Sequence, residues 1–422
     1  MTLATLSENE IISTFIALAM LLMSTYIFGN LFEKIKAPRV VGEIIGGMIW
    51  GGSFLYHFFP EFVSGIFQGY EAEGKVLNIF YQLGLVFLMF LSGFNTNIQI
   101  NRKDAKIMSC VFIGATIIPM AAGIPFINLF REHFVGINGN EISFALVFLI
   151  AIAITSIPVI TKIFFDMGIM NTRFSDTVLT VSTFQDLCLW ILLNTATRIA
   201  STGEIKLLEM IIVVILTIGM FFVAKVISDK INGFRKEISA TGFYSICITV
   251  VLIVCALLYV FGINIMYSAF LVGYMVKAFT KSDDKSEERI KFMRDLSFSF
   301  FIPIYFALVG IQLNVLHNFS PIRFLLFFAL AFSLEAIGTL IMLCFVKINN
   351  ITKINFAVTM NARGGPGIVL ATVAYSYQII NIEFFTVLIL TTMLSSLIAG
   401  YWLRIQQKKD SEIFTDFEKQ AK

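Results

Sequence analysis

The stretch Ala151–Lys162, AIAITSIPVITK, and a second stretch, Met360–Ala371, MNARGGPGIVLA, each place helix-breaking residues inside a long apolar run. Proline lacks an amide donor and clashes with the carbonyl four residues earlier, and glycines let a helix unwind. Free backbone polar groups in hydrocarbon cost several kcal/mol each, so such breaks persist where they line a cavity or face other protein. The two breaks predict a substrate site; a pair of ordinary proline kinks is the alternative. The predicted break residues are Pro158, Gly364, Gly365 and Pro366.

The composition identifies the chain as an integral membrane protein. Of its 422 residues, 57% are hydrophobic and only 14% are charged, which is far from the soluble globular average. Most apolar runs exceed 18 residues, the length at which a helix spans a bilayer. We therefore expect an all-α membrane protein with about thirteen spans, near residues 10–31, 39–54, 77–94, 106–130, 142–163, 174–196, 207–228, 239–261, 263–279, 296–315, 321–346, 354–376 and 384–403.

The basic residues indicate how these spans are oriented. With the N-terminus outside, 25 of the 31 lysines and arginines fall at cytoplasmic ends of the spans. Lysine and arginine are enriched on the cytoplasmic side of membrane proteins, so this asymmetry predicts an N-out, C-in topology. The exceptions are Lys75, Arg131, Arg198, Lys206 and Arg323, which fall outside, and Arg363, which falls within a span.

A short internal repeat relates the two halves of the chain. FLSGFNTNI, Phe90–Ile98, resembles ALVGIQLNV, Ala307–Val315, with Gly93 aligned to Gly310. The second and ninth spans likewise share a small-residue centre, IIGGMIWG and FLVGYMVK. Because the copies lie an odd number of spans apart, they would insert with opposite orientation, as in transporters with a site at mid-membrane. Chance similarity between apolar helices is the alternative.

Three ionisable residues, Asp186, Glu335 and Arg363, lie about 9 to 14 residues into their spans. At roughly 1.5 Å of rise per residue, this places them near the middle of a hydrocarbon core about 30 Å thick. A charge at that depth costs on the order of 3 kcal/mol, so each is expected to face protein or water. Two arrangements stay open. Glu335 and Arg363 pair and leave Asp186 unmatched, or Glu335 shares a site with Asp186.

Asp186, in the stretch STFQDLCLW, is the candidate for the binding carboxylate. Desolvation disfavours a carboxylate anion, so this group would hold either a proton or a cation. Hard cations take oxygen ligands, and Ser182 lies one turn earlier on the same helix face. The further candidate ligands are Gln185, which could serve the cavity or the broken helix, and Thr155 and Ser156.

Five longer motifs occur in order along nearly the whole chain. They are VVGEIIGGMIWGG, LGLVFLMFLSGFNTNI, AITSIPVITKIFFDMGIMNTRFSDTVLTVSTFQD, FFIPIYFALVGIQLNV and NARGGPGIVLATVAY. Together they resemble the monovalent cation:proton antiporter-2 family, which includes the Kef-type and related bacterial sodium/proton antiporters. The resemblance implies a transmembrane antiporter domain over residues 1–403, followed by a short basic cytoplasmic tail over residues 404–422. Kef-type relatives usually carry a soluble nucleotide-sensing domain as well, and gating by such a domain is not expected here.

The resemblance also implies how such a chain is organised. It is similar to elevator-type antiporters, in which a fixed dimerisation part carries a moving transport part whose fifth and twelfth helices cross. The dimerisation part would comprise about residues 10–94 and 239–315, the transport part about residues 106–196 and 321–403, and a linker helix about residues 207–228.

The roles of individual residues follow the same resemblance. The family's sixth helix carries an acidic pair or an amide-aspartate dyad, so Asp186 would alternate between proton and cation, with Gln185 before it. The Gln-Asp form favours potassium, although sodium remains open. A single carboxylate suggests electroneutral exchange. Many relatives carry a lysine three residues before the glycine that is Gly338 here; this chain has Glu335, which makes Arg363 the expected partner of Glu335.

The leading interpretation is a proton-coupled antiporter for sodium or potassium in a bacterial cell membrane, as a homodimer with a possible separate regulatory subunit. A cation channel and a cation-sensing membrane protein are the alternatives; the repeat and the paired breaks favour the antiporter. An enzyme is not expected, since no nucleophile-base pair, metal cluster or phosphate loop lies in the spans. No cofactor and no nucleic-acid partner are predicted.

Overall fold

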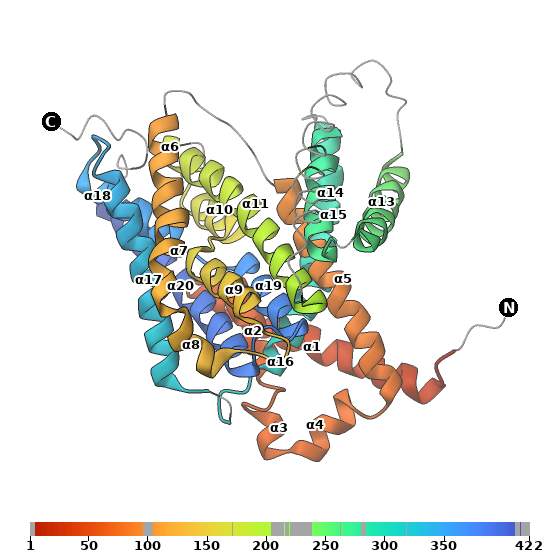
Figure 1. Ribbon diagram of the computed structural model, residues 1–422. Coiled ribbons are helices and arrows are strands. Elements are labelled where there is room, and N and C mark those ends of the chain that lie inside the picture. The colour runs from red at the N-terminus through yellow and green to blue at the C-terminus, as the bar shows by residue number, and fades with distance from the viewer. Residues whose placement is uncertain are drawn as a thin grey trace. The chain divides into compact units, whose positions relative to one another are not determined.

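The structure is a computed structural model that describes residues 5–95, 104–170, 172–203, 239–261, 263–279, 284–317 and 319–409, together with residues 215, 219 and 414. Within these residues the chain is almost wholly helical (Figure 1). The described part contains nine helices that are long and apolar enough to cross a membrane. The expected all-α membrane fold is thereby confirmed, while nearly all of the predicted span 207–228 and most of the tail lie outside the described residues.

The chain divides into two compact units. The dimerisation and transport roles expected for its parts remain predictions. Unit 1 contains α1 (Glu8–Lys34), α2 (Arg39–Met48), α3 (Leu55–Phe58), α4 (Pro60–Phe67), α5 (Glu71–Asn95), α13 (Ala240–Val260), α14 (Ile265–Phe279), α15 (Asp284–Leu296), the π-helix η4 (Ser297–Phe301) and α16 (Ile302–Gln312).

Unit 2 carries the predicted site residues. Its helices are α6 (Ala105–Phe112), the π-helix η1 (Ile113–Ile117), α7 (Ile118–Gly123), the 3₁₀-helix η2 (Ile124–Phe126), α8 (Ile127–Phe134), α9 (Glu141–Ala153), α10 (Ile157–Asp166), α11 (Arg173–Thr202), α17 (Pro321–Leu343), α18 (Asn350–Met360), α19 (Gly365–Ser376) and α20 (Ile382–Lys409).

In unit 1, α2 packs closely on α16 through two glycines. A Cβ atom built on Gly47 would overlap the backbone oxygen of Ala307, and one built on Gly310 would overlap the backbone oxygen of Ile44. Each helix therefore presents a glycine to the backbone of the other, and the two backbones approach as closely as glycine permits.

The pair α5 and α14 packs in the same way, with equivalent residues. A Cβ on Gly273 would overlap the backbone oxygen of Phe90, and one on Gly93 would overlap that of Phe270. In the alignment of the sequence repeat, Gly273 and Phe90 correspond to the Gly47 and Ala307 of the first pair. The repeat predicted from short motifs is thus reproduced as two equivalent helix contacts.

Two features of unit 1 differ from the prediction. The second span, expected over residues 39–54, is helical only to Met48, and Gly51 then lies against the backbone of Ile311. The segment that follows forms the short helices α3 and α4, which the apolar pattern did not predict. Several aromatic side chains of this segment are exposed, at Phe54, Tyr56, Phe58, Phe59 and Phe62.

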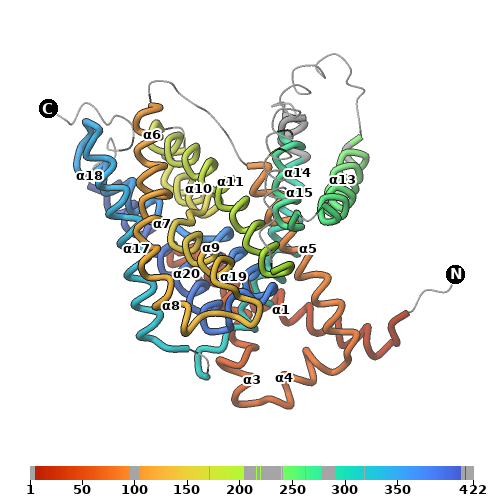
Figure 2. The backbone as a smooth tube through the Cα atoms, in the orientation of Figure 1, coloured from red at the N-terminus to blue at the C-terminus, as the bar shows by residue number. Residues whose placement is uncertain are grey.

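In unit 2, the π-helical turn η1 packs against α17, and the flanking helices α6 and α7 run beside α17 (Figure 2). The contact is made by glycines, since a Cβ on Gly114 would meet the backbone of Gly338, and a Cβ on Gly338 would meet that of Gly114. The fourth span, predicted as one helix over 106–130, is therefore a run of α-, π- and 3₁₀-helical segments that ends at Phe134.

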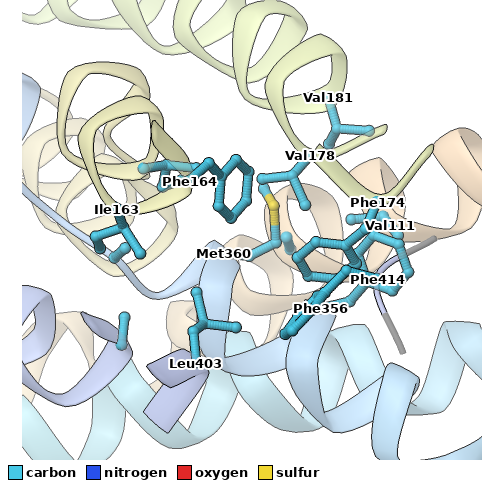
Figure 3. Packing of buried hydrophobic residues seen from close by; sticks show 14 of the residues in the cluster. Val111, Ile163, Phe164, Phe174, Val178, Val181, Phe356, Met360, Leu403 and Phe414 are labelled. Atoms are coloured by element: carbon cyan, nitrogen blue, oxygen red, sulfur yellow. The ribbon is translucent and has the colours of Figure 1, made fainter. Parts of the chain in front are cut away.

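An aromatic cluster packs the first turn of α11 against α18 (Figure 3). The ring centroid of Phe174 lies 4.5 Å from that of Phe356 and 5.3 Å from that of Phe414. All three side chains are fully buried. Aromatic pairs at such separations add stability beyond the area they bury. The cluster therefore anchors the N-terminal end of the helix that carries Asp186.

Candidate functional site

Both predicted breaks divide their segments into two separate helices. Residues 154–156 are non-helical between α9 and α10, and residues 361–364 separate α18 from α19. Pro158 and Pro366 lie in the first turns of α10 and α19, where a missing amide hydrogen has no partner to lose within the helix. The segments are broken helices, and the alternative of simple proline kinks is wrong.

The C-terminal end of α9 leaves backbone carbonyls without helical partners, and side chains from other elements satisfy them. Arg363 donates from Nη2 to the carbonyl of Ile152 at 2.7 Å. Gln185, on α11, donates its Nε2 group to the carbonyl of Ala153, the last residue of α9, and to that of Ala115 in η1. Unsatisfied carbonyls would cost several kcal/mol in a membrane, so these two side chains make the break possible.

The end of α18 is satisfied by the other broken segment. Thr155 Oγ1 donates to the carbonyl of Met360 at 2.6 Å, and the backbone N–H of Ser156 donates to the carbonyl of Ala362 at 2.8 Å. Gly364 allows this approach, because a Cβ at that position would collide with the side chain of Ser156. The two breaks therefore contact each other directly, which is the crossing that the family resemblance implied.

Glu335, on α17, forms an ion pair with Arg363 at this crossing. Arg363 Nη2 lies 3.1 Å from Glu335 Oε2, and the two side chains are 1% and 0% exposed. Thr155 Oγ1 lies 3.3 Å from the other carboxylate oxygen. Of the two arrangements that the sequence left open, the structure has the one in which Glu335 and Arg363 neutralise each other.

Asp186 lies fully buried on α11. Among the described residues, neither of its carboxylate oxygens has a hydrogen-bond partner. Ser182, one turn earlier, is also buried, and its hydroxyl likewise has no partner in the described part of the chain. A buried carboxylate anion without donors is strongly destabilised, and a proton or a bound cation removes that penalty.

Gln185 is the third side chain on this stretch of α11 to carry an oxygen. Only the NH₂ group can donate to the carbonyls of Ala153 and Ala115, so the orientation of the side-chain amide is determined. Its Oε1 atom is buried and has no hydrogen-bond partner within the described residues. A carboxylate, a hydroxyl and an amide oxygen on two successive turns of one helix are the ligand types that a hard cation prefers.

The structure brings most predicted site residues into one network. Thr155, Ser156, Glu335 and Arg363 are connected through the crossing. Gln185 binds the carbonyl of Ala153, next to the Ile152 carbonyl that Arg363 binds. Within the described residues, no hydrogen bond links the side chain of Ser182 or Asp186 to this network. These two residues therefore provide unused polar groups beside a network that is otherwise occupied in holding the breaks.

Sequence reasoning missed the backbone acceptors and one side chain. The carbonyl of Ile152 binds Arg363, and the carbonyl of Ala153 binds Gln185. Every residue type has a backbone carbonyl, so the sequence does not show which carbonyls lack a helical partner. Asn361 lies in the second break, where its Nδ2 donates to the carbonyl of Ala357 at 3.0 Å. Its Oδ1 is buried and without a partner among the described residues. A polar side chain next to a glycine-rich break was the available signal.

The fold and the site define a helical membrane transporter built around two crossed, broken helices. The chain belongs to the sodium/hydrogen exchanger family, because residues 18–408 match the family described as sodium/hydrogen exchanger, transmembrane.

Individual relatives are similar over most of this chain. Cation/H(+) antiporter 18 of Arabidopsis thaliana is 23% identical over 389 residues, which are 90% of this chain and 47% of that protein. The Na(+)/H(+)-K(+) antiporter GerN of Bacillus cereus is 22% identical over 399 residues, 92% of this chain and 95% of that protein. The chain thus spans about half the length of the plant relatives it matches.

Among solved structures, the sodium proton antiporter MjNhaP1 from Methanocaldococcus jannaschii is similar, with a TM-score of 0.64. The match covers 95% of this chain and 99% of that one at 16% sequence identity. The two chains therefore share a fold.

Proposed function

We propose that this protein exchanges protons for a monovalent cation across a cell membrane, with proton and cation competing for Asp186. The observation that carries the proposal is the environment of that carboxylate, which is fully buried and has no hydrogen-bond donor among the described residues. Such a group is stable only when a proton or a cation neutralises it. Exchange requires that the proton and the cation exclude each other at one binding site.

The surrounding oxygens support cation binding. Ser182 and Gln185 each have a buried oxygen near Asp186 in the sequence of α11, and neither oxygen has a hydrogen-bond partner among the described residues. The hydroxyl of Thr155 donates to the carbonyl of Met360 and that of Ser156 accepts from the N–H of Val159 at the start of α10, so both residues support the site by holding the breaks. Sodium and potassium both occur in the names of relatives, and the cation carried here is one of these two.

The charges support electroneutral exchange. Glu335 and Arg363 neutralise each other, which leaves Asp186 as the unpaired carboxylate among the predicted site residues. One carboxylate then releases one proton for each monovalent cation it binds. We further propose an elevator motion in which the part carrying Asp186 moves against a dimeric part.

The proposal is tested by dequenching of a pH-gradient dye in inverted vesicles, with sodium, potassium, lithium and rubidium added in turn. The intact protein is expected to move protons when its cation is added. Asp186→Asn should abolish this response because the amide can neither release a proton nor supply the charge that a cation needs. Asp176→Asn is the matched control, since Asp176 is an exposed aspartate in the first turn of the same helix.

Two outcomes would reject parts of the mechanism. Cation-driven proton movement that survives in folded Asp186→Asn protein excludes Asp186 as the shared binding group. A current that follows the membrane potential without proton coupling would indicate a channel instead. Exchange whose rate is independent of the membrane potential supports the one-for-one stoichiometry.

A further inference from the structure

Two histidines, His57 and His317, face each other at the surface of unit 1. His57 lies on α3 and His317 in the turn after α16, 260 residues apart in sequence. His317 Nε2 lies 3.2 Å from His57 Nδ1, and the ring centroids are 5.1 Å apart. Both residues are exposed. The chain has three histidines in all, so this pairing joins two of its scarcest side chains.

The backbone around the pair is held in place by its own hydrogen bonds. The hydroxyl of Ser53 donates to the carbonyl of Leu313 at 2.7 Å and accepts from the N–H of Val315 at 3.0 Å. Asn314 Oδ1 accepts from the N–H of His317 at 3.1 Å. The segments that follow α2 and α16 are thus fixed to each other, and the two imidazoles are brought together by the fold rather than by chance contact of long side chains.

The separation of the two nitrogens suits a metal ion. Zinc binds imidazole nitrogens at about 2.0–2.1 Å in tetrahedral geometry, which places two such ligands roughly 3.3 Å apart. The observed 3.2 Å is close to this value. To bind a metal ion, each imidazole takes the tautomer that leaves this nitrogen unprotonated, so that both nitrogens present a lone pair to the ion. Imidazole is a preferred ligand of zinc, nickel and copper ions.

We propose that His57 and His317 form a binding site for a divalent transition-metal ion, on the face of unit 1 that the charge pattern places outside the membrane. In the described part of the chain, no group of three or more His, Cys, Asp or Glu side chains is arranged to hold a metal. Water therefore completes the coordination shell, and the ion is exchangeable. By joining the segments after α2 and α16, the ion stabilises the folded form of unit 1.

The first test uses full-length protein purified in detergent without a polyhistidine tag. Zn²⁺ is titrated by calorimetry, and thermal unfolding is followed with and without the ion. Wild-type protein is expected to bind Zn²⁺ and to unfold at a higher temperature when Zn²⁺ is present. His57→Ala and His317→Ala should each weaken Zn²⁺ affinity at least about tenfold and remove the stabilisation, since loss of even a supporting group costs about 10- to 100-fold in metal affinity.

His133→Ala is the matched control, because His133 is an exposed histidine in the other unit. It should bind Zn²⁺ like the wild type. The second readout is electron paramagnetic resonance with Cu²⁺, in which the signal should show two imidazole nitrogens in wild type and fewer in His57→Ala. The five cysteines are present in every variant, so differences report the histidines alone.

The proposal is rejected if wild-type protein binds no Zn²⁺, or if His57→Ala and His317→Ala bind it as tightly as the wild type. Equal loss in the His133→Ala control would reject it as well, because general damage to the fold would then explain the change. None of these readouts depends on transport, so they remain informative if the proposed exchange function fails.

Discussion

At the scale of single residues, one nitrogen of Arg363 connects the charge pair to the helix break. Nη2 lies 3.1 Å from Glu335 Oε2 and 2.7 Å from the carbonyl oxygen of Ile152. The guanidinium therefore neutralises a buried carboxylate and also provides a positive charge at the C-terminal end of α9, where the helix dipole is negative. Removing the guanidinium would leave both the Glu335 carboxylate and the Ile152 carbonyl without this partner.

The first prediction concerns this pair. Arg363→Met leaves Glu335 as an unpaired buried charge, which should lower the free energy of unfolding by about 3–5 kcal/mol. Glu335→Gln should also lower the free energy of unfolding, because it leaves Arg363 as an unpaired buried charge. The double variant Glu335→Gln/Arg363→Met should lose clearly less than the sum, as measured by thermal unfolding of purified protein in detergent. Additive losses would show that the two groups do not depend on each other.

Part of this site follows from the sequence and part of it does not. Asp186, Glu335 and Arg363 are recognisable because charges inside apolar runs are expensive and must be accommodated. Their pairing depends on which helices become neighbours, and a position along a single span does not determine that. Gln185 donates its NH₂ group to the end of α9, while its oxygen has no partner among the described residues. This arrangement depends on a carbonyl that only the fold exposes.

At the scale of elements, the crossing of the two broken segments depends on the small size of Gly364. Its backbone conformation, with φ of −165°, is open to any residue, so the constraint is space rather than backbone strain. A Cβ there would collide with Ser156 and Val159, both on the other broken segment. The close approach allows the backbone hydrogen bond from Ser156 to Ala362, which satisfies the end of α18.

Gly364→Ala is therefore expected to push the two segments apart. Overpacking of this kind costs about 1–3 kcal/mol, and here it also weakens the bonds that satisfy the breaks. We expect a lower unfolding temperature and a loss of cation-driven proton movement in inverted vesicles. Gly400→Ala is the control, since a Cβ on Gly400 would meet only Ile163 at an ordinary 3.7 Å. A Gly364→Ala protein with unchanged exchange would contradict the proposed role of the crossing.

The sequence predicts elements well where an apolar run is long. All predicted spans within the described residues contain helix, and both breaks occur where proline and glycine interrupt the runs. The π-helical turn η1 was not predicted; it lies where Gly114 contacts Gly338 of α17, more than 200 residues later in the chain, and a local apolar pattern carries no sign of that contact. The short helices α3 and α4 were missed because their aromatic residues are exposed and give no periodic core pattern.

At the scale of the whole molecule, the inverted repeat makes a quantitative prediction. Gly93 and Gly310 occupy equivalent places in the two repeats, and each lies against a backbone carbonyl of its partner helix. Gly93→Ala and Gly310→Ala should therefore destabilise the protein by similar amounts, about 1–3 kcal/mol each. Gly74→Ala, at an open position of α5, should leave the unfolding temperature nearly unchanged. Strongly unequal effects of the first two changes would indicate that the repeats are not equivalent in packing.

The distribution of charged residues along the chain predicts the topology of the molecule in the membrane. Lysine and arginine gather at one set of span ends, which predicts that Lys347 faces the cytoplasm and that Ile137 faces outside. Both side chains are exposed, and Ile137 is 90% exposed, so each is accessible to a reagent on its own side.

In a background with the five natural cysteines replaced, Ile137→Cys should react with an impermeant maleimide in right-side-out vesicles. Lys347→Cys should react only after permeabilisation. The opposite labelling pattern would show that unit 2 has the inverse orientation. Two residues on opposite sides must be separated by an odd number of membrane crossings. Labelling of both positions from one side would therefore overturn the assignment of spans between them.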